Sequence, residues 1–499
     1  MESTLGGYSR GAIANLFIRS KGKAELRKVA DAKGQVIIVV VFLISRLIMV
    51  LSGIRIHVDY AFMHFHDVEL IQNRFWESVF YTHAFTPWIN MVVGFVFLFP
   101  ESSHMAIYQT LFYLMSISSL LIFYRLLIYF KIKDWVSVST VIFFSLIPAY
   151  IYFEHFLSYT FPSMLLVLIV TYALLKTLEY DTFRSWLIFF SWCVLLCFVR
   201  TTFHYIWLIA IITGVLILQK QLSKKVLLAF ALPATLLFGW CLKNFILFGF
   251  FGASSWAGFN LSFTTVNRLN LPEKEQLVKA EKLSPLALIP IYSGIESYQD
   301  YVDLEEKTGI AVLDETQKGQ PGWNNYNHKG FIELSPLRMK DNLFYMKEFP
   351  LQYFRTVAVG VAQFFGPTSR WHPHDAAKSP HIPIREKIEG WEDLYNIALH
   401  TLPIRKVGLY MFFLAGFAFI LFRYLRDLFK WKTFNRREKV FALSAMNVFY
   451  VTSLSCLVTI GELARYRFMI EPLIWLLFIV FITESYRKIK TSISARDQT

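Results

Sequence analysis

The chain is dominated by apolar runs that are about as long as a membrane is thick. A helix needs about 20 apolar residues to cross the hydrocarbon core of a bilayer. With 55% hydrophobic residues and a mean hydropathy of +0.44, the sequence indicates an all-α, multi-pass membrane protein. We expect ten transmembrane helices, over residues 36–53, 105–124, 135–153, 159–177, 184–200, 205–219, 226–248, 406–422, 440–460 and 468–486.

Lysine and arginine gather on alternating sides of these runs. Such clusters mark cytoplasmic segments, so both termini are expected in the cytoplasm. The clusters also account for the net charge of +14, and nucleic acid is not needed to explain it. They span Arg19 to Lys33, Arg125 to Lys133, Lys176 to Arg184, Lys220 to Lys225, Arg423 to Lys439, and Arg487 to Arg496.

Two shorter apolar stretches, residues 87–100 and 350–366, would put basic clusters on the wrong face if either crossed the membrane alone. We therefore expect both to be re-entrant or interfacial helices on the outer face. The resulting organisation has a basic cytoplasmic N-terminus at 1–35, a membrane module at 36–248 with a first outer loop at 54–104, a large extracytoplasmic region at 249–404, the last transmembrane helices at 405–486 and a cytoplasmic tail at 487–499.

The first outer loop is rich in carboxylates and imidazoles. Asp59, Asp67, Glu69 and Glu77 share it with several histidines. If 66–80 forms an interfacial helix, Asp67 lies near the headgroup plane, where a carboxylate could accept a proton as a general base. Any single acid could equally be a solvated loop residue, but four in one short loop favour at least one functional carboxylate.

A second constellation opens the last apolar run. Arg465 and Arg467 lie close to Glu471 at its outer end. Guanidinium groups form bidentate hydrogen bonds with phosphate, whereas the outer leaflet offers little other reason for positive charge. An anion site is expected here, with an interfacial snorkelling pair as the alternative.

Further polar residues mark the outer ends of other runs: Glu154 and His155 after the third, Arg200 after the fifth, and Lys243 near the end of the seventh. Glu154, His155 and Arg200 could line the same cavity, whereas Lys243 begins a segment rich in small residues that permits close approach to a ligand or is simply a flexible exit from the membrane. The sets His64-x-His66-Asp67 and His372-Pro-His374-Asp375 resemble metal ligands, but no further ligand converges on either, so no metal is expected. The four cysteines lie in apolar runs and indicate no disulfide framework.

Four motifs in this order resemble the GT-C superfamily of integral-membrane glycosyltransferases, in particular the lipid A and lipopolysaccharide sugar transferases and the protein mannosyltransferases. The resemblance covers roughly residues 36–265 and 405–486. Thr86 departs from the proline common in the first motif, and no adjacent Asp-Glu pair marks the base. The matching segments are His83-Ala-Phe-Thr-Pro87-Trp-Ile-Asn90, Phe153-Glu154-His155 to Pro162, Lys243-Asn244 with Phe248-Gly249, and Arg465-Tyr-Arg467-Phe to Glu471-Pro472.

The resemblance implies an enzyme that moves a sugar from a polyprenyl-phosphate donor to a glycan, lipid or protein acceptor, with inversion and without metal or other cofactor. It implies Asp67 as the base, with Asp59 and Glu69 as alternatives. Arg465 and Arg467 would hold the lipid phosphate, and further substrate contacts would come from Arg200, Lys243, Glu154, His155 and His83. A bacterial inner membrane is expected, or the endoplasmic reticulum of a eukaryote, with the site on the extracytoplasmic or lumenal face.

Two other readings remain open. An O-antigen polymerase or ligase-like enzyme would centre its catalysis on the large outer region. A transporter or flippase of a lipid-linked or anionic substrate would be expected to show internal repeats and charges near the membrane midplane. In this sequence the charges gather at one face, which favours an enzyme.

Overall fold

The computed structural model describes residues 32–220, 223–366, 384–400 and 434–496, together with residues 416, 418, 422 and 426. Within these residues the chain is mostly helical and contains no strand, which confirms the expected all-α class. The helix expected over 406–422 falls almost entirely outside the described residues.

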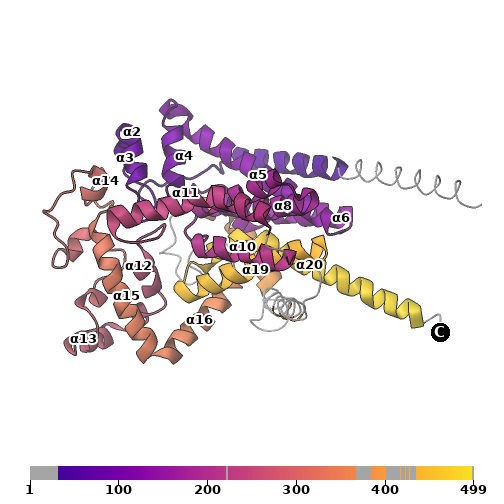
Figure 1. Cartoon of the computed structure of the whole chain (residues 1–499). Coiled ribbons are helices and arrows are strands. Elements are labelled where there is room, and N and C mark those ends of the chain that lie inside the picture. The colour runs from indigo at the N-terminus through magenta and orange to yellow at the C-terminus, as the bar shows by residue number, and fades with distance from the viewer. Residues whose placement is uncertain are drawn as a thin grey trace, which may run out of the picture.

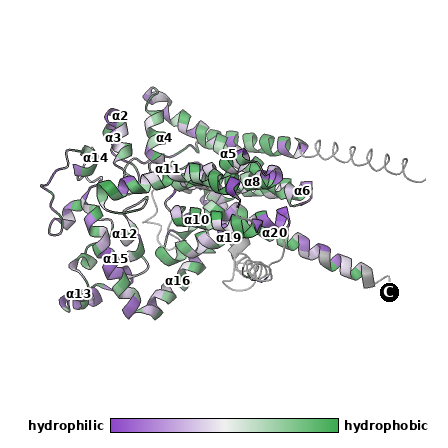
Figure 2. Cartoon of the chain, in the orientation of Figure 1, coloured by the Kyte–Doolittle hydropathy of each residue, from purple (hydrophilic) through white to green (hydrophobic). Residues whose placement is uncertain are grey.

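Among the described residues, six helices are long and apolar enough to cross a membrane. They run side by side through one bundle, and their apolar residues form a continuous band along it (Figures 1 and 2). These six confirm a multi-pass membrane protein. They are Ala32–Leu51, α5 (His104–Tyr129), α8 (Thr160–Tyr180), α11 (Lys224–Phe248), α19 (Arg436–Val458) and α20 (Leu463–Arg496).

The run expected as one helix over 135–153 is bent. It consists of α6 (Asp134–Leu146) and α7 (Pro148–Glu154), which meet at 60°. Pro148 causes the break, because a residue that precedes proline is disfavoured in the helical conformation, and Ile147 is extended with ψ 144°. The pair counts as a seventh candidate span if it is taken as a single element.

Two further runs form helices that are shorter than a full crossing: α9 (Phe183–Val199) and α10 (Tyr205–Gln219). Contacts place the ends of α9 at the two ends of the bundle. Asp181, just before α9, pairs with Lys225 at 2.9 Å, and the Val199 carbonyl accepts a hydrogen bond from Thr86 of the first outer loop. α9 therefore runs alongside α8 and α11, and α10 packs against α19, although neither helix is 18 residues long.

The outer segments gather beyond one end of the bundle (Figure 1). The first outer loop carries three short helices. The large outer region adds a further set and has its own apolar core, in which Ala84 of the first loop packs with Trp256, Phe259 and Phe331. The helices are α2 (Val68–Asn73), α3 (Phe75–Phe80), α4 (Trp88–Val96), α12 (Ala257–Ser262), α13 (Leu271–Lys279), α14 (Ala311–Asp314), α15 (Gly330–Glu348), α16 (Pro350–Phe364) and α17 (Ile384–His400).

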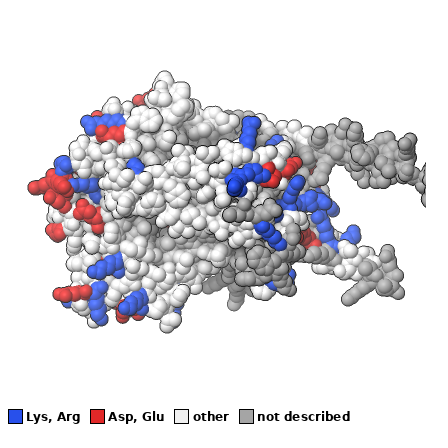
Figure 3. Space-filling model, viewed as in Figure 1, with Lys and Arg blue, Asp and Glu red and all other residues white. Residues whose placement is uncertain are grey.

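Charged side chains occupy the two ends of the molecule and leave an uncharged band between them (Figure 3). Lys and Arg predominate at the end opposite the outer segments, whereas acidic and basic residues mix at the other. The basic end includes Lys225 next to Asp181, and Arg487, which donates to the Lys131 carbonyl. This separation is the arrangement that the alternating basic clusters predict.

Candidate functional site

Asp67 sits where the first outer loop turns into α2. Its Oδ1 accepts hydrogen bonds from the backbone amides of Glu69 at 2.7 Å and Leu70 at 3.2 Å, so it caps the helix. Among the described residues no donor contacts its second oxygen, Oδ2. The side chain is only 8% exposed. Backbone amides therefore hold one oxygen of a buried carboxylate, and the other oxygen can accept a hydrogen bond or a proton from a ligand. The expected helix over 66–80 is in fact two helices, α2 and α3.

A cavity of about 520 Å³ opens beside Asp67. One wall comes from the first outer loop and the other from a turn in the large outer region. Its lining combines aromatic rings, amides, carboxylates and one cation. The lining includes the side chains of Tyr60, His66, Asp67, Glu69, Gln72, Lys318, Gln320 and Trp323.

The turn over Asp67 has a local cause in the sequence. Pro321-Gly322 favours a type II turn, and the Trp323 amide donates to the Gln320 carbonyl at 3.2 Å while Gly322 has φ +85°. A second bond, from the Lys318 amide to the Trp323 carbonyl at 2.7 Å, closes the loop. Gly319 then approaches Asp67 so closely that an added Cβ would lie 2.8 Å from Oδ2.

Lys318 is the buried cation of this cavity, with 2% exposure. Its Nζ donates to the carbonyls of Phe62 at 3.0 Å and Ala61 at 3.4 Å, which ties the turn to the first loop. Burial lowers the pKa of Lys318 to about 7, against the opposing pull of the Asp59 and Asp67 carboxylates. The ammonium therefore titrates close to neutral pH.

The two other candidate bases lie at the margins. Asp59 is partly buried, and its Oδ1 accepts from the Ala61 amide at 3.0 Å. It is not among the residues that line the cavity. Glu69 does line the cavity but is exposed. Of the three acids, Asp67 alone is both buried and part of the lining.

His66 and His83 hold the first outer loop in place. His66 bonds within the loop, and His83 bonds to the large outer region. His66 Nε2 donates to the Thr82 hydroxyl at 2.6 Å, since that hydroxyl itself donates to the Ser78 carbonyl. His83 Nε2 donates to the Asn327 carbonyl at 2.8 Å, and its Nδ1 accepts from Ser255 at 2.9 Å. Burial lowers the pKa of each imidazole to about 3, so both stay neutral.

Lys243 also secures this loop. From the outer end of α11, its Nζ donates to the carbonyls of Phe80 at 2.8 Å and Thr82 at 3.2 Å and lies 3.8 Å from the Trp240 ring centre. Further along the chain, Gly258 permits close packing against α15, because a Cβ there would collide with the backbone carbonyl of Ser335. Lys243 and His83 therefore stabilise the position of the first outer loop in this structure.

A second group of polar residues, Tyr159, Arg200 and Arg465, lies around His64. The Tyr159 hydroxyl accepts from Arg465 at 3.2 Å and lies 2.6 Å from His64 Nε2, to which it can donate. His64 Nδ1 is then a buried N–H that finds no hydrogen-bond partner among the described residues. Burial and the positive charges of Arg465, Arg200 and Lys318 hold the pKa of His64 well below its usual range. His64 therefore lies within the electrostatic influence of both arginines and of Lys318 from the cavity lining.

Arg200 is the more available of these arginines. Its guanidinium is sandwiched between the rings of Tyr159 at 4.0 Å and Tyr466 at 4.6 Å. The side chain is 3% exposed, and its Nη1 has no hydrogen-bond partner in the described part of the chain. Arg465, in contrast, pairs with Glu462. A buried cation without a carboxylate partner is costly unless an anion joins it.

Arg465 and Arg467 do not act together in the structure. Arg467 turns to the end of α16, where its Nη1 donates to the carbonyls of Phe364, at 2.9 Å, and Gly366. Its Nη2 lies 3.9 Å from Glu471 on the next turn of α20. Arg467 therefore fastens α16 to α20, and the arginine that accompanies Arg465 is Arg200.

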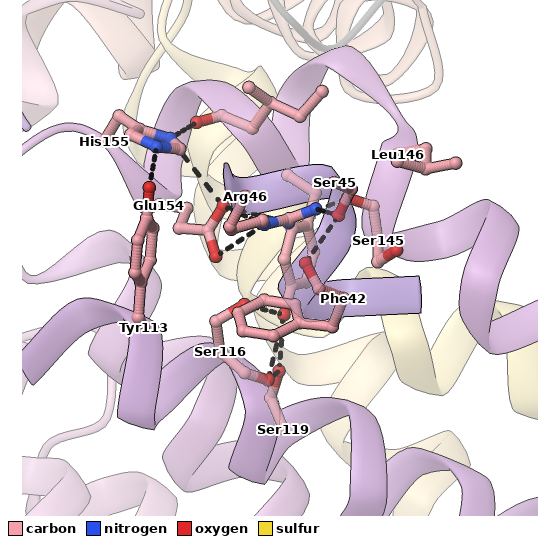
Figure 4. Close-up of polar contacts among 12 residues, drawn as sticks. Phe42, Ser45, Arg46, Tyr113, Ser116, Ser119, Ser145, Leu146, Glu154 and His155 are labelled. Atoms are coloured by element: carbon pink, nitrogen blue, oxygen red, sulfur yellow. Dashed lines mark hydrogen bonds and ion pairs between the residues drawn. The ribbon is translucent and has the colours of Figure 1, made fainter. Parts of the chain in front are cut away.

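Glu154 and His155 belong to a separate buried network (Figure 4). Arg46 Nε donates to both oxygens of Glu154, at 2.9 and 3.2 Å, and Arg46 Nη2 donates to the Ser145 carbonyl that the α6–α7 break leaves free. His155 Nε2 lies 3.2 Å from the Tyr113 hydroxyl. The network secures the broken helix.

A second cavity, of about 370 Å³, lies next to Tyr466. It is bounded by the start of α10, the outer end of α19 and the segment that leaves α11. Most of the lining is apolar, but Thr202, His204 and Ser455 add polar groups. Since Tyr466 also stacks on Arg200, this largely apolar space adjoins the available guanidinium.

Three residues of these networks and cavities were not predicted from the sequence: Arg46, Lys318 and Trp323. A lone arginine inside the first apolar run was a signal, because a charge at that depth needs a partner. The Pro-Gly turn before Trp323 indicated only a turn. In the described residues, no group of three or more His, Cys, Asp or Glu side chains converges as a metal site, and 372–375 fall outside them.

Comparison with models of known protein families, and with curated proteins, found no match to this chain.

Proposed function

We propose that this protein is an integral-membrane glycosyltransferase that uses a polyprenyl-phosphate sugar as its donor. The observation that carries the proposal has two parts. Asp67 is a buried carboxylate with one oxygen that accepts no hydrogen bond from the described residues. Arg200, which has no carboxylate partner among them, stacks on Tyr159, and Tyr159 contacts His64 of the same loop as Asp67. Transfer of a sugar from a lipid phosphate needs both a base for the acceptor and a cation for the departing phosphate.

Asp67 is the base in this mechanism. Its Oδ2 accepts the proton of an acceptor hydroxyl while the Glu69 and Leu70 amides hold Oδ1. The hydroxyl oxygen attacks the anomeric carbon, and the bond from that carbon to the phosphate oxygen breaks. The electron pair leaves with the polyprenyl phosphate, and the configuration inverts. Asp59 and Glu69 remain the alternatives because both lie within the same loop.

Arg200 is the main phosphate ligand, with Arg465 beside it. Developing negative charge on the leaving phosphate is stabilised most by a cation that is already fixed and desolvated. The stacked rings of Tyr159 and Tyr466 fix Arg200, and Glu462 neutralises Arg465 in part. The apolar cavity beside Tyr466 fits the first prenyl units of the donor.

The topology that completes the proposal has ten transmembrane helices, two of them short, with both termini in the cytoplasm. The outer segments then face the bacterial periplasm, or the lumen in a eukaryote. The basic end of the bundle supports this orientation. A transporter of lipid-linked substrates remains the second candidate, because a buried arginine beside an apolar cavity would also bind such a lipid.

The test measures release of polyprenyl phosphate by purified protein from a panel of polyprenyl-phosphate sugars. Arg200→Gln should weaken product inhibition by polyprenyl phosphate by about tenfold or more, since hydrogen bonds to charged groups contribute about 1.5–3 kcal/mol. Arg355→Gln, which removes an exposed arginine of α16, should leave it unchanged. Binding of the lipid phosphate without turnover of any donor would favour the transporter.

A further inference from the structure

The cavity beside Asp67 has the composition of a saccharide site. We infer that the acceptor presents to this cavity a sugar ring without acidic groups, so that the protein extends a glycan or glycosylates a sugar headgroup. This inference rests on the proposed function, since it concerns the substrate that Asp67 deprotonates. It concerns a different wall from the donor contacts at Arg200.

The aromatic residues of the lining provide the first argument. Trp323 and Tyr60 both line the cavity and are both partly exposed. The face of an aromatic ring is electron-rich, and it attracts the polarised C–H groups that cover one face of a pyranose. The Tyr60 hydroxyl lies 3.3 Å from Tyr108, which fixes that ring. An acceptor with only a serine or glycerol hydroxyl has no such face to offer.

The polar groups of the lining provide the second argument. Gln72 and Gln320 carry amides that both donate and accept, and Asp67 and Glu69 add carboxylate oxygens. Adjacent hydroxyls of a sugar need donors and acceptors in alternation, which amides and carboxylates supply together. Gly319 keeps the turn close enough for both walls to reach one small ligand.

The charge of the lining excludes acidic sugars. Asp67 and Glu69 line the cavity with Lys318 as the one cation among its described lining residues. Lys318 already donates to two backbone carbonyls and faces Asp59 as well as Asp67. An acidic ligand would meet two carboxylates and a cation that is already engaged, whereas a neutral or amino sugar would not.

The size of the space is compatible with this ligand. About 520 Å³ lies within the range of sites that enclose small molecules, roughly 300–1,000 Å³. All residues that line the cavity belong to the outer segments and none to the long helices of the bundle. Because those segments lie beyond one end of the bundle (Figure 1), a water-soluble ring can reach the cavity. The donor lipid would instead approach from the bundle, by way of the second cavity next to Tyr466 and Arg200.

Binding can be tested without catalysis. Saturation-transfer NMR on the full-length protein in detergent would use neutral trisaccharides of gluco, galacto and manno configuration, an amino trisaccharide, a uronic-acid trisaccharide and a serine peptide. At least one neutral or amino saccharide should bind, the uronic-acid form at least tenfold more weakly, and the peptide not at all. Trp323→Ala should weaken saccharide binding at least tenfold. Trp76→Ala is the matched control, since Trp76 is a 75% exposed residue of α3 outside the cavity.

The outcomes separate this inference from the proposed function. Saccharide binding that depends on Trp323, without turnover of any donor, would support the acceptor site and contradict the glycosyltransferase. Sugar transfer to the peptide or to phosphatidylglycerol, with no binding of any saccharide, would overturn the acceptor site and keep the glycosyltransferase. Equal binding by Trp323→Ala and wild type would also overturn the inference.

Discussion

At the scale of single residues, the site depends on how the backbone holds Asp67. A carboxylate whose first oxygen caps a helix presents its second in one direction, which is the preorganisation that a general base needs. The same N-cap bonds stabilise α2. The local sequence Asp67-Val-Glu-Leu therefore both starts the helix and orients the carboxylate. Asp67 therefore has a structural role and a proposed chemical one.

Gly319→Ala tests this placement without touching the carboxylate itself. The new Cβ would lie 2.8 Å from Asp67 Oδ2, and the residue has φ +37°, so the side chain or the turn must move. Donor turnover should fall at least tenfold. Gly322→Ala is a matched control, because φ there is +85° but nothing lies within 4 Å of its Cβ. If both variants lose activity equally, backbone strain in the turn explains the loss and contact with Asp67 does not.

The sequence predicts part of this site, namely Asp67, Arg200 and Arg465, but not Lys318 or Trp323. Dense acids and buried arginines are visible in a sequence because they are costly near a membrane. Which arginine faces Tyr159 depends on the rotation of α20, and Arg465 and Arg467 diverge because they lie two positions apart on one helix. The role of Lys318 could not be predicted, since 257 residues separate it from the Ala61 carbonyl that it binds.

At the scale of elements, the buried Arg46–Glu154 pair joins the first helix to the α6–α7 break. It also supports the outer loop, because the chain after Glu154 pairs with His57 through backbone bonds of 2.7 and 3.0 Å. Arg46→Met should destabilise the protein by about 3–5 kcal/mol, since it leaves the Glu154 carboxylate buried alone. Apparent melting temperature in detergent would report this loss.

The double variant Arg46→Met with Glu154→Gln is the control for that prediction. Removal of both charges takes away the unpaired carboxylate, so the double variant should recover much of the lost stability. If the double variant is no more stable than Arg46→Met, the bond from Arg46 to the Ser145 carbonyl matters more than the ion pair.

The positions of the long helices were predicted better than the break in one run and the lengths of two others. Runs of about 20 apolar residues specify helices because the backbone must satisfy its hydrogen bonds internally. The break at Pro148 and the short lengths of α9 and α10 depend on proline geometry and on packing against neighbours, which hydropathy does not report. The apolar core of the large outer region was not anticipated, because Ala84 and Phe331 lie far along the chain from Trp256 and Phe259, with which they pack.

At the scale of the whole molecule, the proposal requires the outer segments and the basic end to lie on opposite sides of a membrane. Single-cysteine labelling of intact cells tests this. The four native cysteines are buried, so they should contribute little background. Glu306→Cys, at a side chain that is 69% exposed in the outer region, should react with an impermeant thiol reagent. Arg437→Cys, at the start of α19, should react only after permeabilisation; the reverse pattern would invert the orientation.

The central claim is that Asp67 removes the acceptor proton, and one kinetic comparison tests it most directly. Purified wild type, Asp67→Asn and Glu77→Gln would be compared for release of polyprenyl phosphate from a donor that the wild type turns over. Glu77 is the matched control, because it lies in the same loop outside the cavity and pairs with Arg74 at 3.6 Å. Asp67→Asn should lose about 10²–10⁴-fold in kcat while Glu77→Gln stays near wild type. Undiminished turnover by folded Asp67→Asn would contradict the account.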